Sequence, residues 1–223
     1  MLLYQFRKGT NPRRVIIYMS EKGIDVPRYE LDYENKEHRS EAYLSINPSG
    51  RAPTLVTDAG EAITDSAAIV EYLEELYPKH PMFGTEAASR ARVRSLERLA
   101  ADLVGRGQLW LWNRTDAFLG KEPAPSLEVA NRISRYVDEI LNVLEKEIGE
   151  HAFLAGDTPT VADCTAFPIF QTARERFDLP FGDKHPRLAR LIHRAVVCGV
   201  FWADGARDRA SVLTRVDLDR SVS

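Results

Sequence analysis

The chain has 223 residues, with 30 Lys and Arg against 33 Asp and Glu, a formal net charge of −3 and a pI near 6.0. No basic surplus exists to attract nucleic acid, and no apolar run approaches the length of about 18 residues that a membrane span requires. The apolar start at residues 1–6 is interrupted by Arg7 and Lys8, too soon for a signal peptide. We therefore expect a soluble, cytoplasmic protein that binds neither nucleic acid nor membrane.

Cysteine usage gives no sign of a disulfide framework or of a metal site. The two cysteines, Cys164 and Cys198, fall in predicted helices and form no Cys-x-x-Cys pair. We expect both to be small core residues, and we expect no metal.

The first part of the chain reads as a strand, a helix and a second strand. Residues 2–6 alternate with a period of two, and a helix is predicted from Pro12, with Asn11 as its N-cap, to Gly23. Residues 27–31 form the next strand. So short a strand–helix–strand unit implies a parallel strand pair.

Two more strands and two helices complete this half. A short helix over residues 42–46 is stopped by Asn47 and Pro48, and strands follow at 54–57 and 62–63. Asp65 and Ser66 begin a helix that reaches about residue 77. Its predicted apolar face consists of Ile69, Leu73 and Leu76. The order is βαβαββα.

Beyond Pro78 the strand signals stop, and Pro78-Lys79-His80-Pro81 reads as a linker. We predict domains at 1–78 and 87–223, joined by residues 79–86. The second domain is expected to be an all-α helical bundle, with a loop at 121–125 and a charged tail from Asp204. Its two strongest helical stripes are Val93, Leu96, Leu99, Ala100 and Leu103, and Ile133, Tyr136, Val137, Ile140, Leu141, Leu144 and Ile148.

Thr160-Val161-Ala162-Asp163 has the spacing of a capping box at the start of another helix. Its loss is expected to cost about 1 kcal/mol of stability. Pro168 is predicted to kink this helix, and a last helix is predicted over residues 187–198.

A ligand site is predicted where residues 47–56 meet Thr64, Asp65 and Ser66. If the Ala52–Pro53 bond is cis, the backbone of Ala52 turns outward and can pair with an extended peptide. The helix start at Ser66 supplies amides and a dipole that favour an anion. Together they suggest a small peptide with a free carboxylate, although a strand-starting proline and a capped helix would also explain these residues.

Four motifs in this order resemble the glutathione transferase superfamily over most of the chain. They are Asn47-Pro48-x-Gly50-x-Ala52-Pro53, Asp65-Ser66, Glu71-Tyr72-Leu73 and Thr160-x-x-Asp163. The resemblance implies an α+β fold, with a thioredoxin-like N-terminal domain followed by an all-helical C-terminal domain. It also implies that the peptide is glutathione, bound as a co-substrate.

The resemblance assigns glutathione contacts residue by residue. Ala52, before the cis-proline Pro53, would exchange backbone hydrogen bonds with the cysteinyl unit, while Asp65 and Ser66 would hold the γ-glutamyl end. Arg51 follows Gly50, where many members carry a polar or basic residue, and His38 lies where members often contact the glycyl carboxylate. For both, a solvated surface side chain is an equal alternative.

The residue that would activate the glutathione sulfur departs from the common family patterns. Gln5 falls where the tyrosine classes carry their Tyr, Gly9 falls at the usual serine position, and the loop contains no cysteine. Asn11 is the preferred donor to the thiolate, as in some bacterial and fungal relatives, and Thr10 is the second candidate. Backbone donors alone, or a purely capping role for Asn11, stay open.

The resemblance implies a glutathione transferase that adds the thiolate to a small hydrophobic electrophile. The acceptor would lie between the domains, near Lys8 and the helix carrying Arg106, Trp110 and Trp112. A glutathione-dependent disulfide or peroxide reductase is one alternative, and a non-catalytic binding or scaffold protein is another.

A homodimer is also implied by the resemblance. The helix of Glu71 and Tyr72 and the basic residues Arg90, Arg92 and Arg94 are its candidate contact surfaces, with solvated surface as the alternative.

Overall fold

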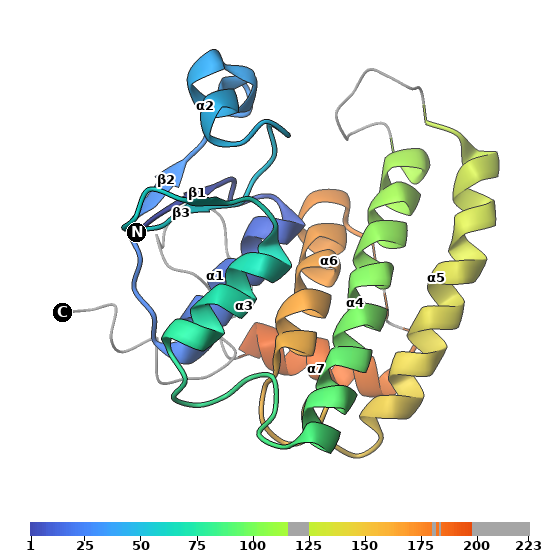
Figure 1. Cartoon of the computed structure of the whole chain (residues 1–223). Helices are drawn as coiled ribbons and strands as arrows, with labels where there is room; N and C mark the ends of the chain where they lie inside the picture. Colours follow the sequence, from blue (N-terminus) through green and yellow to red (C-terminus); the bar gives the residue numbers. More distant parts are fainter. Residues whose placement is uncertain (116–124, 180–181, 183, 198–223) are drawn as a thin grey trace. The chain divides into compact units, whose positions relative to one another are not determined.

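A computed structural model of the chain describes residues 1–115, 125–179, 182 and 184–197 (Figure 1). The chain divides into two compact units, with the boundary between Pro81 and Met82. Most of the predicted loop at 121–125, together with Cys198 and the tail from Asp204, lies outside the described residues. Cys164 is a buried residue of the core, as predicted.

The first unit is built on a four-stranded sheet in the order β2-β1-β3-β4. Strand β1 (Leu2–Gln5) runs parallel to β2 (Arg28–Glu30), which confirms the predicted strand–helix–strand unit. Strand β3 (Thr54–Val56) is antiparallel to both β1 and β4 (Ala62–Ile63). Helices α1 (Thr10–Lys22) and α3 (Ser66–Leu76) lie side by side against the sheet, while α2 (Glu41–Ile46) stands apart from them (Figure 1).

The prediction that Asn11 caps α1 is wrong. Gly9 is the N-cap, in an extended conformation, and its carbonyl accepts from Arg13 N at 3.2 Å. Asn11 is therefore the second residue of the helix, and Pro12 is the third. The first amides of a helix have no intrahelical acceptor, so a proline is tolerated throughout the first turn and does not fix where the helix begins.

The apolar face of α3 is narrower than predicted. Ile69 and Leu73 are fully buried, but Leu76 is 48% exposed. It is the last residue of the helix, one turn beyond the buried Leu73, where the helix extends past the core that covers its earlier turns.

The second unit is a bundle of α4 (Ala87–Arg114), α5 (Leu127–Ile148), α6 (Val161–Phe177) and α7 (Pro186–Val197). Helix α4 packs against both α5 and α6. The apolar stripe predicted for α5 is buried at Val137, Ile140, Leu141, Leu144 and Ile148. Tyr136, which was predicted to belong to it, is 51% exposed. Its ring instead lies 5.1 Å from the guanidinium of Arg106. Pro168 lies inside α6.

The capping box at the start of α6 is confirmed and is deeply buried. Asp163 Oδ2 accepts from Thr160 N and Thr160 Oγ1, each at 2.9 Å. Its Oδ1 accepts from Leu154 N at 2.8 Å, so the same carboxylate also ties down the preceding loop. Burial raises the pKa of Asp163 to about 6, although these hydrogen bonds oppose the shift.

Candidate active site

Three strand ends lie together at one end of the first unit's sheet. Strand register places Leu55 opposite Ile63 in the β3–β4 pair and Tyr4 opposite Thr54 in the β1–β3 pair. Because both pairs are antiparallel, the start of β3, the end of β4 and the end of β1 lie at the same end of the sheet, which we call the shared edge. The residues that adjoin these strand ends are Ala52, Ser66 and the first turn of α1.

The turn that carries Ala52 is organised by Asn47, which is only 1% exposed. Its amide nitrogen donates to Arg51 O at 2.8 Å and to Thr54 Oγ1 at 2.9 Å. Its oxygen accepts from Ser49 N at 3.0 Å and from Ser49 Oγ at 2.8 Å. One buried side chain therefore satisfies its full hydrogen-bonding capacity and fixes the path of the turn.

Tyr43 and Gly50 complete this turn. The Tyr43 hydroxyl donates to Arg51 O at 2.6 Å and lies 2.9 Å from Thr54 Oγ1. Gly50 has a φ of 60°, and a Cβ there would lie 2.7 Å from Nη1 of Arg39. Any side chain at position 50 would therefore be strained and would clash. The Ala52–Pro53 bond that follows is cis.

Asp65 and Ser66 start α3 as predicted, but part of their hydrogen-bonding capacity is used internally. Asp65 Oδ1 accepts from Ala67 N at 2.8 Å and from Ala68 N at 3.2 Å. These are two of the amides that we expected to face an anion. Asp65 does not use Ser66 N or Ser66 Oγ, although Ser66 is only 4% exposed. The exposed Asp65 can still face an ammonium group.

Arg51 is exposed, and His38 is half-buried. The His38 ring stacks on Tyr33, with ring centroids 4.0 Å apart and an interplanar angle of 10°. Burial and then the neighbouring cations Arg39 and Lys36 lower the pKa of His38. A neutral imidazole can bind a carboxylate only as an uncharged donor.

The first turn of α1, which follows the end of β1 after residues 6–9, carries both predicted sulfur donors, and the two differ in environment. Thr10 is buried and Asn11 is exposed. The first turn contains no acidic residue, so the helix dipole there favours an anion. Gln5 is buried, and its side-chain nitrogen donates to Glu30 Oε2 at 3.0 Å.

The sequence analysis did not identify two tyrosines of this region as structural contacts. The Tyr43 hydroxyl donates to Arg51 O, and the Tyr33 hydroxyl accepts from Ala52 N at 3.1 Å. Neither contact has a local sequence signal, because the partners are 8 and 19 residues apart.

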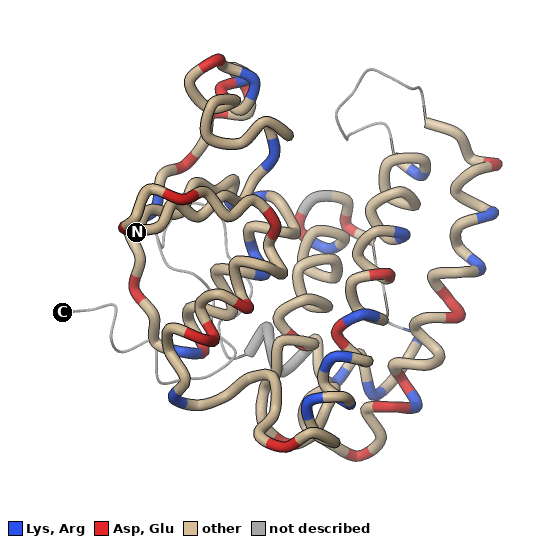
Figure 2. The backbone as a smooth tube through the Cα atoms, viewed as in Figure 1, with Lys and Arg blue, Asp and Glu red and all other residues tan. Residues whose placement is uncertain are grey.

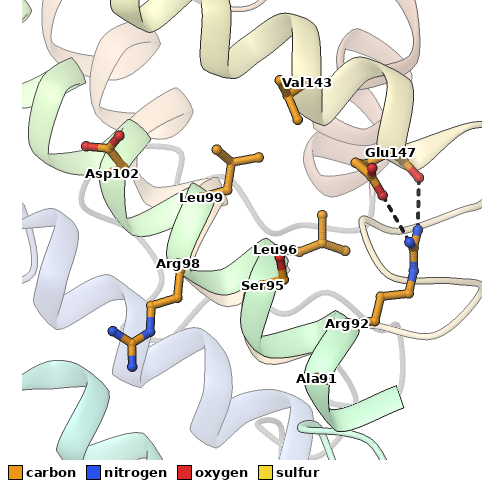
Figure 3. A pocket seen from close by; sticks show the side chains of 9 residues that line it. All are labelled: Ala91, Arg92, Ser95, Leu96, Arg98, Leu99, Asp102, Val143 and Glu147. Atoms are coloured by element: carbon orange, nitrogen blue, oxygen red, sulfur yellow. Dashed lines mark hydrogen bonds and ion pairs between the residues drawn. The ribbon is translucent and has the colours of Figure 1, made fainter. Parts of the chain in front are cut away.

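A sizeable groove is found elsewhere, on the second unit between α4 and α5 (Figure 3). It has a volume of about 780 Å³, with Val143 opposite Leu96 and Leu99. Within the second unit, Arg106 pairs with Asp102 at 2.8 Å.

The described part of the chain contains no His, Cys, Asp and Glu cluster that could hold a metal ion. Nor does any described helix have the length and apolarity needed to cross a bilayer.

Comparison with known proteins agrees with this architecture. The family model for the glutathione S-transferase N-terminal domain matches residues 3–81, and the model for the C-terminal domain matches residues 115–196. The chain therefore belongs to the glutathione S-transferase family, whose members use glutathione as a co-substrate.

Individual relatives cover nearly the whole chain. A maleylacetoacetate isomerase from Pseudomonas aeruginosa is 35% identical over 204 residues, which is 90% of this chain and 93% of the relative. A zeta class glutathione S-transferase from Euphorbia esula is 31% identical, covering 85% and 82% of the two chains. The crystal structure of a glutathione S-transferase domain-containing protein from Marinobacter aquaeolei superposes with a TM-score of 0.75 at 28% identity, covering 87% and 97%. The chain is thus an enzyme of this family.

Proposed function

We propose that the shared edge formed by Ala52, Ser66 and the start of α1 binds glutathione and presents its thiolate to a small electrophile. The observation that supports this proposal is the strand register, in which the end of β1, the start of β3 and the end of β4, the strand ends next to these three segments in the sequence, lie at the same end of the sheet. Ala52 supplies a peptide-pairing edge, and Ser66 supplies donors for a carboxylate. Arg51 and His38 are the candidate contacts for the rest of the tripeptide.

Asn11 is the proposed donor to the sulfur, with Thr10 as the second candidate. Its exposure supports this choice, because a ligand can reach its side-chain amide without moving the backbone. A thiol has a reference pKa near 8.5, and each unit of lowering requires about 1.4 kcal/mol of preferential thiolate stabilisation. One amide hydrogen bond and the dipole of α1 can together supply about that amount.

The relative from Pseudomonas aeruginosa favours an unsaturated, cis-configured acceptor as the second candidate substrate class. The thiolate would add to one alkene carbon, and the displaced electron pair would move towards the adjacent carbonyl. After rotation about the resulting single bond, the pair would return and expel the thiolate. Nothing is oxidised or reduced, and glutathione is regenerated.

Product formation measured beside glutathione consumption separates the two reactions. A conjugating enzyme consumes one glutathione per product, whereas an isomerase converts a cis-dicarboxylate with no net loss of thiol. Formation of glutathione disulfide with a disulfide substrate would instead indicate a reductase. If the protein is retained on immobilised glutathione but turns over no aryl halide, maleyl compound or disulfide, the result would favour the non-catalytic binding or scaffold protein.

A homodimer that uses the α4–α5 groove is also proposed. Basic residues recur along the first turns of α4, but Arg92 already pairs with Glu147 at 2.9 Å, Arg90 donates to Gly84 O at 3.2 Å and Arg94 lies over Phe83 (Figure 2). Charge alone therefore does not define the interface.

Val143, an exposed apolar residue that lines the groove, gives the sharper test of this dimer. Val143→Glu should convert a sedimenting dimer into a monomer, whereas Val129→Glu, at an exposed site on α5 outside the groove, should not. A dimer that persists in the Val143→Glu variant would contradict this assignment.

A further inference from the structure

The Ala52 amide, which the proposed function assigns to glutathione, already donates to a side chain of the same unit. Its acceptor is the Tyr33 hydroxyl oxygen, at an N–O distance of 3.1 Å. The Tyr33 ring is held between two others. Phe6 lies at a centroid distance of 4.2 Å and an angle of 21°, and His38 lies at 4.0 Å and 10°. Tyr33 is therefore positioned by stacking, and its hydroxyl reaches the peptide-pairing edge.

An amide hydrogen makes one well-aligned hydrogen bond, so Tyr33 and a peptide carbonyl cannot both accept from Ala52 with good geometry. We propose that Tyr33 is an internal ligand of this edge, and that the cysteinyl carbonyl of glutathione must displace its hydroxyl in order to bind. This inference rests on the proposed function. It adds a residue that sets affinity by competition.

The segment that carries Tyr33 and the turn that carries Ala52 each have hydrogen bonds of their own. The segment is closed on itself, since Glu37 N donates to Asp32 O at 2.8 Å and Asp32 N donates to Glu37 Oε2 at 2.7 Å. The turn at Ala52 is held independently by Asn47 and its partners. Besides the Tyr33 contact, the two are joined by a hydrogen bond from Arg39 Nη1 to Ser49 O at 3.2 Å.

The Tyr33 oxygen is a neutral acceptor, because burial raises the pKa of its phenol above the usual 10.0. A net hydrogen bond of this kind contributes about 0.5–1.5 kcal/mol, which corresponds to roughly 2- to 13-fold in an equilibrium constant. Tyr33→Phe removes the competing oxygen and keeps the ring between Phe6 and His38. The variant should therefore bind glutathione more tightly than the parent.

The experiment is calorimetric titration with glutathione of the parent, Tyr33→Phe and Tyr29→Phe. Tyr29 is the matched control, because its hydroxyl donates to Glu37 Oε1 of the same segment at 2.6 Å, whereas the Ala52 amide donates to Tyr33. We expect the Kd to fall roughly 2- to 13-fold in Tyr33→Phe and to stay unchanged in Tyr29→Phe. The amide resonance of Ala52 should differ between parent and Tyr33→Phe without glutathione, and should converge at saturation.

Each of the other possible results would overturn the proposal, and each has a different meaning. An unchanged Kd in Tyr33→Phe means that no competition exists, while the proposed glutathione site stands. A higher Kd in Tyr33→Phe means that the hydroxyl contacts the ligand directly. An equal fall of the glutathione Kd in Tyr29→Phe would mean that the effect comes from general loosening of the segment that carries Tyr33. Absence of binding in all three chains removes the proposed function and the inference with it.

Discussion

The turn at Asn47–Thr54 and the helix start at Thr160–Asp163 are both built around one buried polar side chain, but the two differ in charge. Asn47 is a neutral amide whose donors and acceptor are all satisfied. Asp163 is a fully buried carboxyl whose pKa is raised to about 6. The first network shapes the turn that carries Ala52, where glutathione is proposed to bind, whereas the second fixes the start of α6 and the loop before it. A buried polar network can thus support a proposed ligand site or only the fold, and the backbone segment that it fixes distinguishes the two cases.

Asp163→Ala should give the largest effect. It removes the acceptor of three buried hydrogen bonds, so the expected loss is roughly 3–5 kcal/mol of unfolding free energy, well above the ~1 kcal/mol of an ordinary cap. Urea unfolding followed by the fluorescence of Trp110 and Trp112 in α4 measures this loss. The control is Ser126→Ala, which removes the cap of α5 and should cost about 1 kcal/mol or less.

The pH dependence of stability should separate the same two regions. Asp163 has a pKa of about 6 in the folded state against 3.8 for the free side chain. Between these two pH values the folded state keeps a proton that the unfolded state has released. The stability from this group is present below pH 3.8 and is lost as pH rises through about 6, by up to about 3 kcal/mol. Asp163→Ala should abolish that slope, and Asn47→Ala should leave it intact. Unfolding midpoints at about pH 4 and pH 7 provide the test, and parallel slopes in parent and Asp163→Ala would refute it.

Asn47→Ala should lower stability by about 2 kcal/mol and should also weaken glutathione binding, because it frees the turn that carries Ala52. Asp163→Ala, measured under conditions where it is folded, should leave the glutathione Kd unchanged. The matched control is Asn35→Ala, which removes only an exposed hydrogen bond to Asp32. Unchanged affinity in Asn47→Ala would separate the turn from the ligand site.

Ser66→Ala should have the smallest effect on folding and a selective effect on the ligand. Loss of one hydroxyl donor to a carboxylate is expected to raise the glutathione Kd roughly 3- to 10-fold. Ser45→Ala, in α2, removes only a local bond to Ala42 O and should leave the Kd as it is. Equal Kd values for the two variants would exclude Ser66 as a contact.

The features that could be predicted from the sequence were local. The βαβ unit followed from periodicity, the start of α3 from Asp65, and the capping box from the spacing of Thr160 and Asp163. In each case the interacting groups are close in sequence, so propensity and hydrogen bonding act within one element.

The features that were missed depend on tertiary contacts or on small shifts in register. Pro12 is compatible with any first-turn position, so it could not identify Gly9 as the cap. Leu76 and Tyr136 match the helical period, but periodicity does not show where the neighbouring elements end. The hydrogen bond from Ala52 to Tyr33 joins residues 19 positions apart, and no local pattern predicts it.

The pKa of the glutathione thiol bound to the protein tests the central claim most directly. Thiolate absorbance is titrated against pH with saturating glutathione, for the parent, Asn11→Ala and Thr10→Ala. We predict that the parent holds this pKa at least one unit below about 8.5 and that Asn11→Ala returns it towards that value with a lower turnover and little change in Kd. Thr10→Ala should stay close to the parent. A bound thiol that titrates at about 8.5 in the parent would contradict the account.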